Sequence, residues 1–272
     1  GMLDEAIEAY KKCISLKPDF AEVYSNMGVA LKNQGKLDES IEAFKKSISL
    51  KPNDAESYYN MGITLNHQGK FDETICAYKK TISLNPDHAK AYNNLGLVLQ
   101  VQGMTDEVIE AYKKAILLNP QYAEAYNNLG IFLQDQGKLE EALKAYKKAI
   151  SLKPDYTEVL SNIGNILKDQ DSLEEALESY NKALLLKPND ADICYNLANI
   201  LHDLGRLDEA EFNFRQALLL RPDFADAYHN LSFTLLNNGK LKEGLDQLEW
   251  RWKNPEFLST KERHFLQPQW DG

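Results

Sequence analysis

The chain has 272 residues, 43% of them hydrophobic and 26% charged, which is typical of a soluble globular protein. No run of about 18 apolar residues occurs and the N-terminus lacks the pattern of a secretion signal, so we expect no contact with membranes. The formal net charge of −10 disfavours nucleic acid, because phosphate binding requires a cationic surface. We interpret the three distant cysteines, Cys13, Cys76 and Cys194, as small core residues in a reducing compartment, and expect a cytoplasmic protein.

A period of 34 residues runs through the chain. Prolines recur at this spacing, as Pro18, Pro52, Pro86, Pro120, Pro154, Pro188 and Pro222. Residues 1–20 match the second helix of a truncated repeat, although the sequence does not tell whether Gly1 and Met2 are native. Counted from Ala21, six full repeats cover 21–224 and a degenerate seventh covers 225–254. Such a period predicts a stack of identical helical units.

Each repeat contains two predicted helices. Apolar residues recur at positions four, seven and eleven of the repeat, as in Tyr92, Leu95 and Leu99, and again from position seventeen to twenty-eight. Between these segments stands a glycine, or Asp171 in the fifth repeat, which can end a helix in the left-handed conformation. Small residues at positions eight and twenty are expected to face one another and bring the helices close. The sequence therefore predicts an all-α fold of antiparallel helix pairs.

The pattern Tyr-x-x-Leu-Gly-x-x-Leu, followed by Gly, Ala, Tyr, Ala and Pro at fixed offsets, resembles the tetratricopeptide repeat over about residues 1–254. The resemblance implies a right-handed α-solenoid superhelix whose first helices line a concave groove for peptides or partner proteins. No catalytic, phosphate-binding or metal-binding motif occurs, and the five histidines are scattered. We therefore expect a binding protein with no catalytic residues, no cofactor and no metal in this chain.

Position six of every repeat is asparagine, a poor helix former that costs about 0.5 kcal/mol relative to alanine. These seven residues, here called the asparagine ladder, are Asn26, Asn60, Asn94, Asn128, Asn162, Asn196 and Asn230. A carboxamide can donate to and accept from the main chain of an extended peptide. With first helices about 10 Å apart and a strand advancing about 3.4 Å per residue, one asparagine would meet roughly every third peptide residue. Two alternatives to peptide contact stay open: inheritance from recent duplication, and structural bridges between repeats.

Other positions of the first helices extend the predicted peptide-binding site. From positions five and nine it includes Tyr59, Asn93, Asn127, Tyr195, Asn165 and Asn199. Position two is mostly acidic, which either attracts basic or neutral segments or complements the helix N-termini. Position nine is aliphatic in the first four repeats, asparagine in the next two and phenylalanine, Phe233, in the seventh, so we expect a drier groove at one end. Only Lys90 is basic at position two, and we expect no clamp for a terminal carboxylate.

The sequence leaves the repeat after residue 254, and we interpret 255–272 as a cap or linker. The stretches "EWRW" and "QPQWDG" resemble the junction between repeats and a glycosyltransferase domain in bacterial tetratricopeptide proteins. The ladder likewise resembles the asparagine-lined superhelix of O-linked N-acetylglucosamine transferase, which holds protein substrates. These resemblances imply an alternative function, as the substrate-recruiting arm of a glycosyltransferase whose catalytic domain lies beyond residue 272. A third hypothesis, an RNA-reading solenoid, is disfavoured by the acidic charge and the unvarying asparagine. The apolar face of the N-terminal half-repeat offers a surface for self-association.

Overall fold

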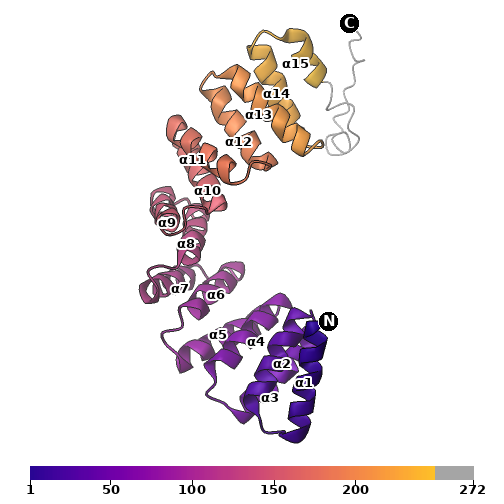
Figure 1. The fold of residues 1–272 in the computed structure, drawn as a ribbon. Coiled ribbons are helices and arrows are strands. Elements are labelled where there is room, and N and C mark those ends of the chain that lie inside the picture. The colour runs from indigo at the N-terminus through magenta and orange to yellow at the C-terminus, as the bar shows by residue number, and fades with distance from the viewer. Residues whose placement is uncertain (249–272) are drawn as a thin grey trace, which may run out of the picture. The chain divides into compact units, whose positions relative to one another are not determined.

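The computed structural model describes residues 1–248, which form α-helices and no strand (Figure 1). The prediction of an all-α fold of helix pairs is confirmed. The helices are α1 (Met2–Leu16), α2 (Ala21–Asn33), α3 (Leu37–Leu50), α4 (Ala55–His67), α5 (Phe71–Leu84), α6 (Ala89–Val101), α7 (Thr105–Leu118), α8 (Ala123–Asp135), α9 (Leu139–Leu152), α10 (Thr157–Asp169), α11 (Leu173–Leu186), α12 (Ala191–Asp203), α13 (Leu207–Leu220), α14 (Ala225–Asn237) and α15 (Leu241–Leu248). None of them is long and apolar enough to cross a membrane. The predicted cap or linker at 255–272 lies outside the described residues.

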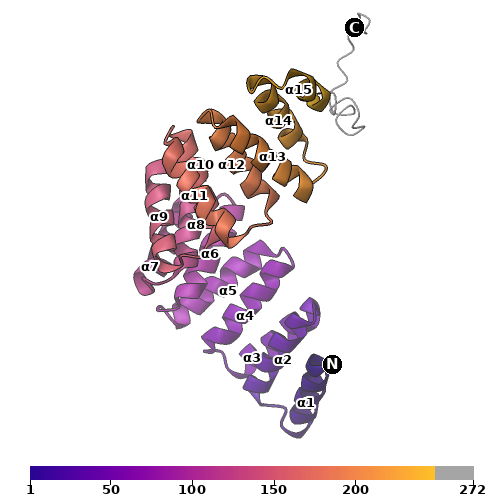
Figure 2. The ribbon, with the colours of Figure 1, turned by 45° about the horizontal axis from the view of Figure 1, so that its top comes forward.

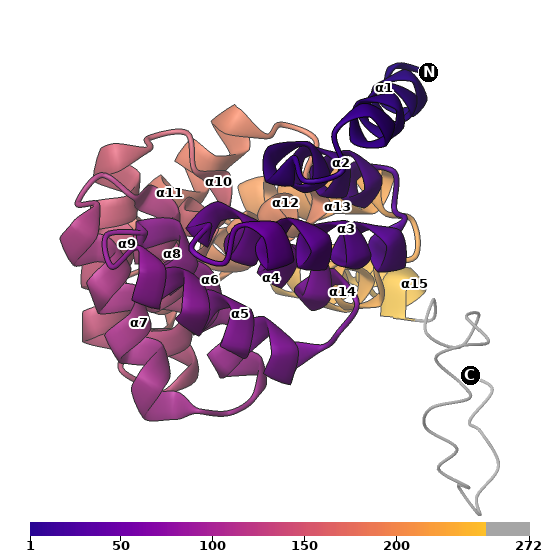
Figure 3. The same cartoon turned by 90° about the horizontal axis from the view of Figure 1, so that it is seen from below.

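The chain forms two compact units, residues 1–152 and residues 153–272. The N-terminal unit contains α1 and the pairs from α2–α3 to α8–α9, and the described part of the C-terminal unit contains α10–α11, α12–α13 and α14–α15. Within each unit, consecutive helices pack together, so that α3 joins the pair α2–α3 to the pair α4–α5 (Figure 2). Helix α1 covers α2 at the start of the N-terminal unit (Figure 3). First helices also touch one another, as α2 with α4, α6 with α8, and α12 with α14.

Left-handed residues end the first helices. The backbone φ angle is between 71° and 78° at the predicted glycines, from Gly35 to Gly239, and 59° at Asp171. This confirms both the glycine positions and the substitution by aspartate, whose side chain tolerates the left-handed region better than most. At Gly137 the N–H donates to the Gln134 carbonyl at 2.9 Å, which satisfies one of the last free carbonyl groups of α8.

The core of a repeat forms where the glycine at position eight meets the aromatic ring at position twenty-four. A Cβ built on Gly130 would lie only 2.5 Å from Cε1 of Tyr146, whose ring is fully buried. The same approach, at 2.7 to 2.8 Å, occurs at Gly28, Gly62, Gly96 and Gly164. The glycine therefore makes room for this ring, and position twenty also faces position eight, since the Ser40 hydroxyl donates to the Gly28 carbonyl at 2.7 Å. Of the three cysteines only Cys194 is buried, and Cys76 is exposed, so the interpretation as core residues is correct for Cys194 alone.

Candidate functional site

One side of each first helix is open to solvent. Positions two, six, nine and thirteen are separated by four, three and four residues, which places them on one helical face. In α4 these are Glu56, Asn60, Ile63 and His67. The equivalent residues are exposed or half-buried in every other first helix. We call this surface the first-helix face, and it carries the whole asparagine ladder.

The ladder residues differ in their hydrogen bonds. Three of them donate from Nδ2 to the preceding repeat: Asn94 to the Tyr59 hydroxyl (3.2 Å), Asn128 to Oδ1 of Asn93 (3.0 Å), and Asn230 to the Tyr195 hydroxyl (3.0 Å) and Oδ1 of Asn199 (2.7 Å). Asn60 instead donates to the Glu56 carbonyl of its own helix at 3.0 Å. Within residues 1–248, the remaining three have no side-chain hydrogen bond: Asn26, Asn162 and Asn196. Bridging between repeats therefore accounts for some ladder residues and not for others.

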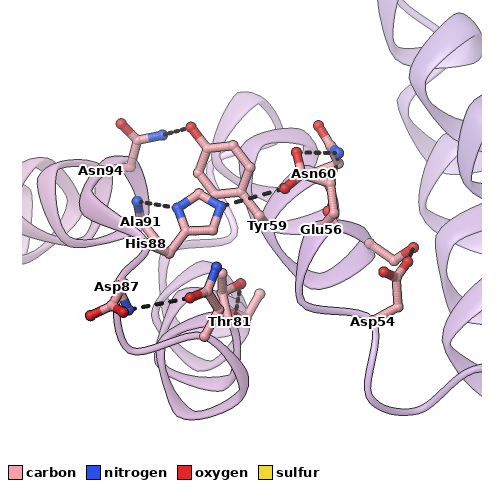
Figure 4. Close-up of polar contacts among 12 residues, drawn as sticks. Asp54, Glu56, Tyr59, Asn60, Thr81, Asp87, His88, Ala91 and Asn94 are labelled. Carbon is pink, nitrogen blue, oxygen red and sulfur yellow. Dashed lines mark hydrogen bonds and ion pairs between the residues drawn. The ribbon is translucent and has the colours of Figure 1, made fainter.

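Tyr59 contacts residues of its own repeat and of the next one (Figure 4). Its hydroxyl accepts the hydrogen bond from Asn94, and its ring centroid lies 4.5 Å from that of His88 and 5.9 Å from that of Tyr78. Burial, reinforced by the negative charge of Glu56, raises the pKa of Tyr59. Burial thus disfavours the ionised phenolate, and the neutral hydroxyl is the form that accepts from Asn94.

Tyr195 repeats this arrangement in the C-terminal unit. Its hydroxyl accepts from Asn230, and its ring centroid lies 4.7 Å from that of Phe224 and 5.9 Å from that of Phe214. We call each such group, a tyrosine with its asparagine and its stacked ring, a tyrosine clasp. Both predicted tyrosines thus take part in contacts between repeats.

His88 belongs to the first tyrosine clasp. From the sequence no role was predicted for this histidine, which is one of five scattered along the chain. It precedes α6, where its Nδ1 accepts from the Ala91 N–H at 3.1 Å, while its Nε2 lies 3.5 Å from Oε2 of Glu56 (Figure 4). Because Nδ1 is an acceptor, the proton of the neutral ring is on Nε2 and faces the carboxylate. A signal was present in the sequence. Position thirty-four, just before the next first helix, is an aromatic residue or histidine before five of the seven first helices. It stacks where position five of the same repeat is tyrosine.

The predicted asparagines at position five are buried between repeats. Asn93 is 4% exposed and Asn127 is 3% exposed. Asn93 accepts from Asn128 and donates to Oδ1 of Asn94 at 3.3 Å, whereas Oδ1 of Asn127 has no partner among the described residues. Position five lies outside the four positions of the first-helix face, on the flank that packs against the next repeat. Asn93 therefore supports two ladder residues, Asn94 and Asn128, by hydrogen bonds, whereas Asn127 is buried beside the ladder without such a bond among the described residues.

The other two predicted asparagines lie on the first-helix face, at position nine. Oδ1 of Asn165 accepts from the Tyr180 hydroxyl, and Oδ1 of Asn199 accepts from Asn230. Both side chains are half-buried, and neither amide nitrogen donates a hydrogen bond within residues 1–248. In the N-terminal unit the same position is aliphatic, as at Leu97, which is 42% exposed. Position nine is thus aliphatic throughout the N-terminal unit, whereas in the C-terminal unit it carries two asparagines and, in α14, Phe233, which is 45% exposed.

The acidic residues of the face are only partly neutralised. In the C-terminal unit Asp192 accepts two hydrogen bonds from Arg221, at 2.9 and 2.5 Å. Four further carboxylates of that face have no ion pair within the described part of the chain: Glu158, Asp169, Asp203 and Asp226. No lysine or arginine occupies the four face positions in that unit, whereas the N-terminal unit has Lys90. The C-terminal part of the face is therefore negatively charged.

Family models match most repeats. A model described as tetratricopeptide repeat matches residues 21–54, 89–122, 123–156 and 191–224, and a second one of the same description matches 43–75 and 213–246. A model described as TPR repeat matches 1–35, 64–103 and 164–205. No curated protein matches the chain.

Solved structures share the fold. The crystal structure of MamA is 30% identical, with a TM-score of 0.56, over 63% of this chain and 94% of MamA. YrrB, a TPR protein with an unusual peptide-binding site, is 23% identical, with a TM-score of 0.57, over 73% of this chain and 99% of its own. PilF of Pseudomonas aeruginosa is 17% identical, with a TM-score of 0.66, over 82% and 95%. At these identities YrrB and PilF are similar in fold alone.

Proposed function

The chain belongs to the tetratricopeptide repeat family, and we propose that it is a scaffold that binds an extended segment of a partner protein along the first-helix face. The main support is the asparagine ladder itself. Every repeat keeps an asparagine on the solvent side of its first helix, at a cost in helix propensity of about 0.5 kcal/mol each. Three of the seven have no hydrogen bond within the described residues that would explain this cost structurally, namely Asn26, Asn162 and Asn196.

The bonds between repeats determine which atoms a ligand would meet. Asn128 and Asn230 direct Nδ2 toward the preceding repeat, which leaves their Oδ1 atoms as acceptors. Main-chain N–H groups of an extended peptide can donate to such acceptors whatever the peptide's side chains are. We therefore expect recognition to depend on ligand N–H groups spaced by about three residues, the ratio of the helix spacing to the rise of a strand.

The neighbouring positions would add preference. Aliphatic side chains such as Ile63 and Leu97 offer apolar contacts in the N-terminal unit, and free carboxylates favour uncharged or basic residues over the C-terminal unit. YrrB is described as having a peptide-binding site, and its likeness in fold supports the same general use here. The described residues show no feature of a catalytic site, so we propose binding without chemistry.

A peptide selected from a phage-displayed library against the full chain provides the test ligand. We expect the variant Asn26→Ala/Asn162→Ala/Asn196→Ala to bind this peptide at least tenfold more weakly by calorimetry, with an unchanged melting temperature, because these amides make no internal bond. The control variant Asn53→Ala/Asn189→Ala, at exposed turn residues, should bind normally. N-methylation of single ligand amides should reduce affinity at every third residue. Equal affinity of the triple variant, or an effect of ligand side chains alone, would refute backbone recognition.

The alternative, an arm of a glycosyltransferase, stays a prediction. It depends on the sequence of residues 249–272, which lie outside the described part of the structure, and on the ladder. None of the structures described above is a glycosyltransferase. The reading frame after Gly272 tests this alternative directly, since a catalytic domain encoded there would support it and a stop codon would exclude it. Self-association through α1, where Met2 and Leu16 are each 87% exposed, also stays a prediction.

A further inference from the structure

Four surface pockets occupy the same register at four repeat junctions. Each is bounded by the second helix of one repeat and by both helices of the next. Three lie in the N-terminal unit, around α2, α4 and α6, with volumes of about 470, 530 and 310 Å³. The fourth lies in the C-terminal unit between α11, α12 and α13, with about 550 Å³. None of their lining residues belongs to the first-helix face, so these pockets are separate from the proposed peptide site.

The fourth pocket differs from the others in charge. Each N-terminal pocket is lined by at least four charged side chains, which include Lys11, Lys45 or Lys79 at position twenty-five. The fourth pocket has no charged lining residue, because Asn181 replaces that lysine and Gln216 replaces the lysine at position twenty-six.

The remaining replacements in the fourth pocket are apolar. Phe212 stands at position twenty-two, where two of the other pockets have glutamate, and Cys194 replaces the tyrosine at position four. The glutamate at position nineteen, Glu209, lies 2.6 Å from Arg206 and does not line the pocket. Thus an opening common to the fold has become uncharged at this junction.

Two exposed apolar side chains, Leu185 and Phe212, line the uncharged pocket, and Leu219 follows about two turns beyond Phe212 on α13. Leu185 is 82% exposed, Phe212 is 61% exposed and Leu219 is 74% exposed. Phe212 and Leu219 are seven residues apart on α13, on one helical face, and Leu185 lines the pocket from α11. Position twenty-nine, occupied by Leu185, is serine in four of the five preceding units. Exposed apolar groups gathered in this way mark contact sites on soluble proteins.

The same junction lacks polar links. In the described structure no side-chain hydrogen bond or ion pair joins α10 or α11 to α12 or α13. The next junction has several, among them His202 to Thr234 at 2.9 Å and the ion pair of Lys240 with Glu211 at 2.6 Å. The described parts of the fifth and sixth repeats are therefore packed together without side-chain hydrogen bonds or ion pairs, and the pocket opens between them.

We propose that the pocket between α11, α12 and α13 is a second docking site, for an uncharged apolar segment of a partner protein that inserts one side chain of the size of leucine or phenylalanine. Charge complementarity selects this occupant: a charged side chain entering the pocket would lose hydration without meeting an opposite charge. The carboxamides of Asn181 and Gln216 can pair with the segment's main chain. The volume lies within the range of about 300 to 1,000 Å³ that is usual for ligand pockets. A single buried anchor in such a pocket commonly provides much of the binding energy.

Methyl NMR of the full chain with N-acetyl-Leu-Phe-amide tests this proposal. We expect saturable shifts of the Leu184 and Leu185 methyl groups, and none with N-acetyl-Lys-Glu-amide. The variant Asn181→Lys/Phe212→Glu/Gln216→Lys restores residues that occupy these positions in other repeats, so it should fold, and we expect it to bind at least tenfold more weakly. Cys194→Tyr should likewise fill the pocket and weaken binding.

Three outcomes would overturn the proposal. The first is equal affinity of the charge-restored variant, and the second is a response of the N-terminal pockets as large as that of the fourth. The third is a wild-type dimer in sedimentation that the charge-restored variant converts to a monomer, which would make the occupant a second copy of this chain. The ladder variant Asn26→Ala/Asn162→Ala/Asn196→Ala should bind the dipeptide normally, so the two proposals can fail independently.

Discussion

Replacing Gly130 with alanine tests how closely the two helices of a repeat are packed. The added Cβ would lie 2.5 Å from Cε1 and 2.6 Å from Cδ1 of Tyr146, whereas carbon atoms in good contact are about 3.5 to 4.0 Å apart. The ring must therefore move by about 1 Å. It is fully buried, and its hydroxyl donates to Gln134 at 2.9 Å, so such a movement breaks a hydrogen bond or displaces α9.

The expected effect combines two opposing contributions. Overpacking of this kind costs about 1 to 3 kcal/mol, and the anchored ring favours the upper end. Alanine in place of glycine gains about 1 kcal/mol of helix propensity. We therefore expect Gly130→Ala to lower the free energy of unfolding by about 2 kcal/mol, measured from urea unfolding by circular dichroism.

A double-mutant cycle checks whether the ring is the cause. The sixth repeat already combines Ala198 with a ring that has no hydroxyl, Phe214. Adding Tyr146→Phe to Gly130→Ala should therefore restore part of the loss, with a favourable coupling of at least about 0.5 kcal/mol. Unchanged or increased stability of Gly130→Ala, or the absence of coupling, would show that the ring does not set the distance between the helices.

Three further predictions follow from single residues. Asn128→Ala should lower the free energy of unfolding by about 1 kcal/mol because it leaves Oδ1 of Asn93 buried without a donor, whereas Asn162→Ala should change it by less than about 0.5 kcal/mol; equal urea midpoints would contradict this difference. Asp171→Gly should stabilise the chain by about 0.5 kcal/mol in thermal unfolding, because glycine adopts the left-handed conformation without strain. Burial, with smaller contributions from Tyr59 and Glu124, raises the pKa of Tyr122 to about 12, above about 10 in the unfolded chain. The folded state thus retains this proton, so stability is complete below about pH 10 and falls toward pH 12, and Tyr122→Phe should reduce the fall in urea midpoints over that window.

The helices and their ends could be predicted because their causes are local. A glycine or Asp171 after the first helix and a proline after the second act through the backbone of the same segment. The spacing of apolar residues determines which face packs, as at Tyr92 and Leu95. Because these features recur in successive repeats, each predicted helix can be compared with the equivalent helices of the same chain. A single helix offers no such comparison.

Contacts between repeats were harder to predict. Ladder residues are identical in sequence, yet Asn94 and Asn128 bond to the preceding repeat while Asn162 does not. The difference depends on which side chain lies 35 residues earlier and on how far its acceptor atom is from the asparagine. Helical periodicity predicts neither of these. Likewise His88 acquires its role only by stacking on Tyr59, a residue of another helix pair.

The junction between the fifth and sixth repeats has a mechanical consequence. Side-chain hydrogen bonds connect the repeats at the other junctions within each unit. Such bonds resist separation until they break over a short distance, whereas apolar contacts are lost gradually as the surfaces move apart. When the C-terminal unit is pulled between its ends, strain should concentrate where α11 meets α12, and extension should begin there. A protein bound across α11 and α13 would strengthen this junction. Its binding would then be measured as an increase in the force at which the C-terminal unit begins to extend.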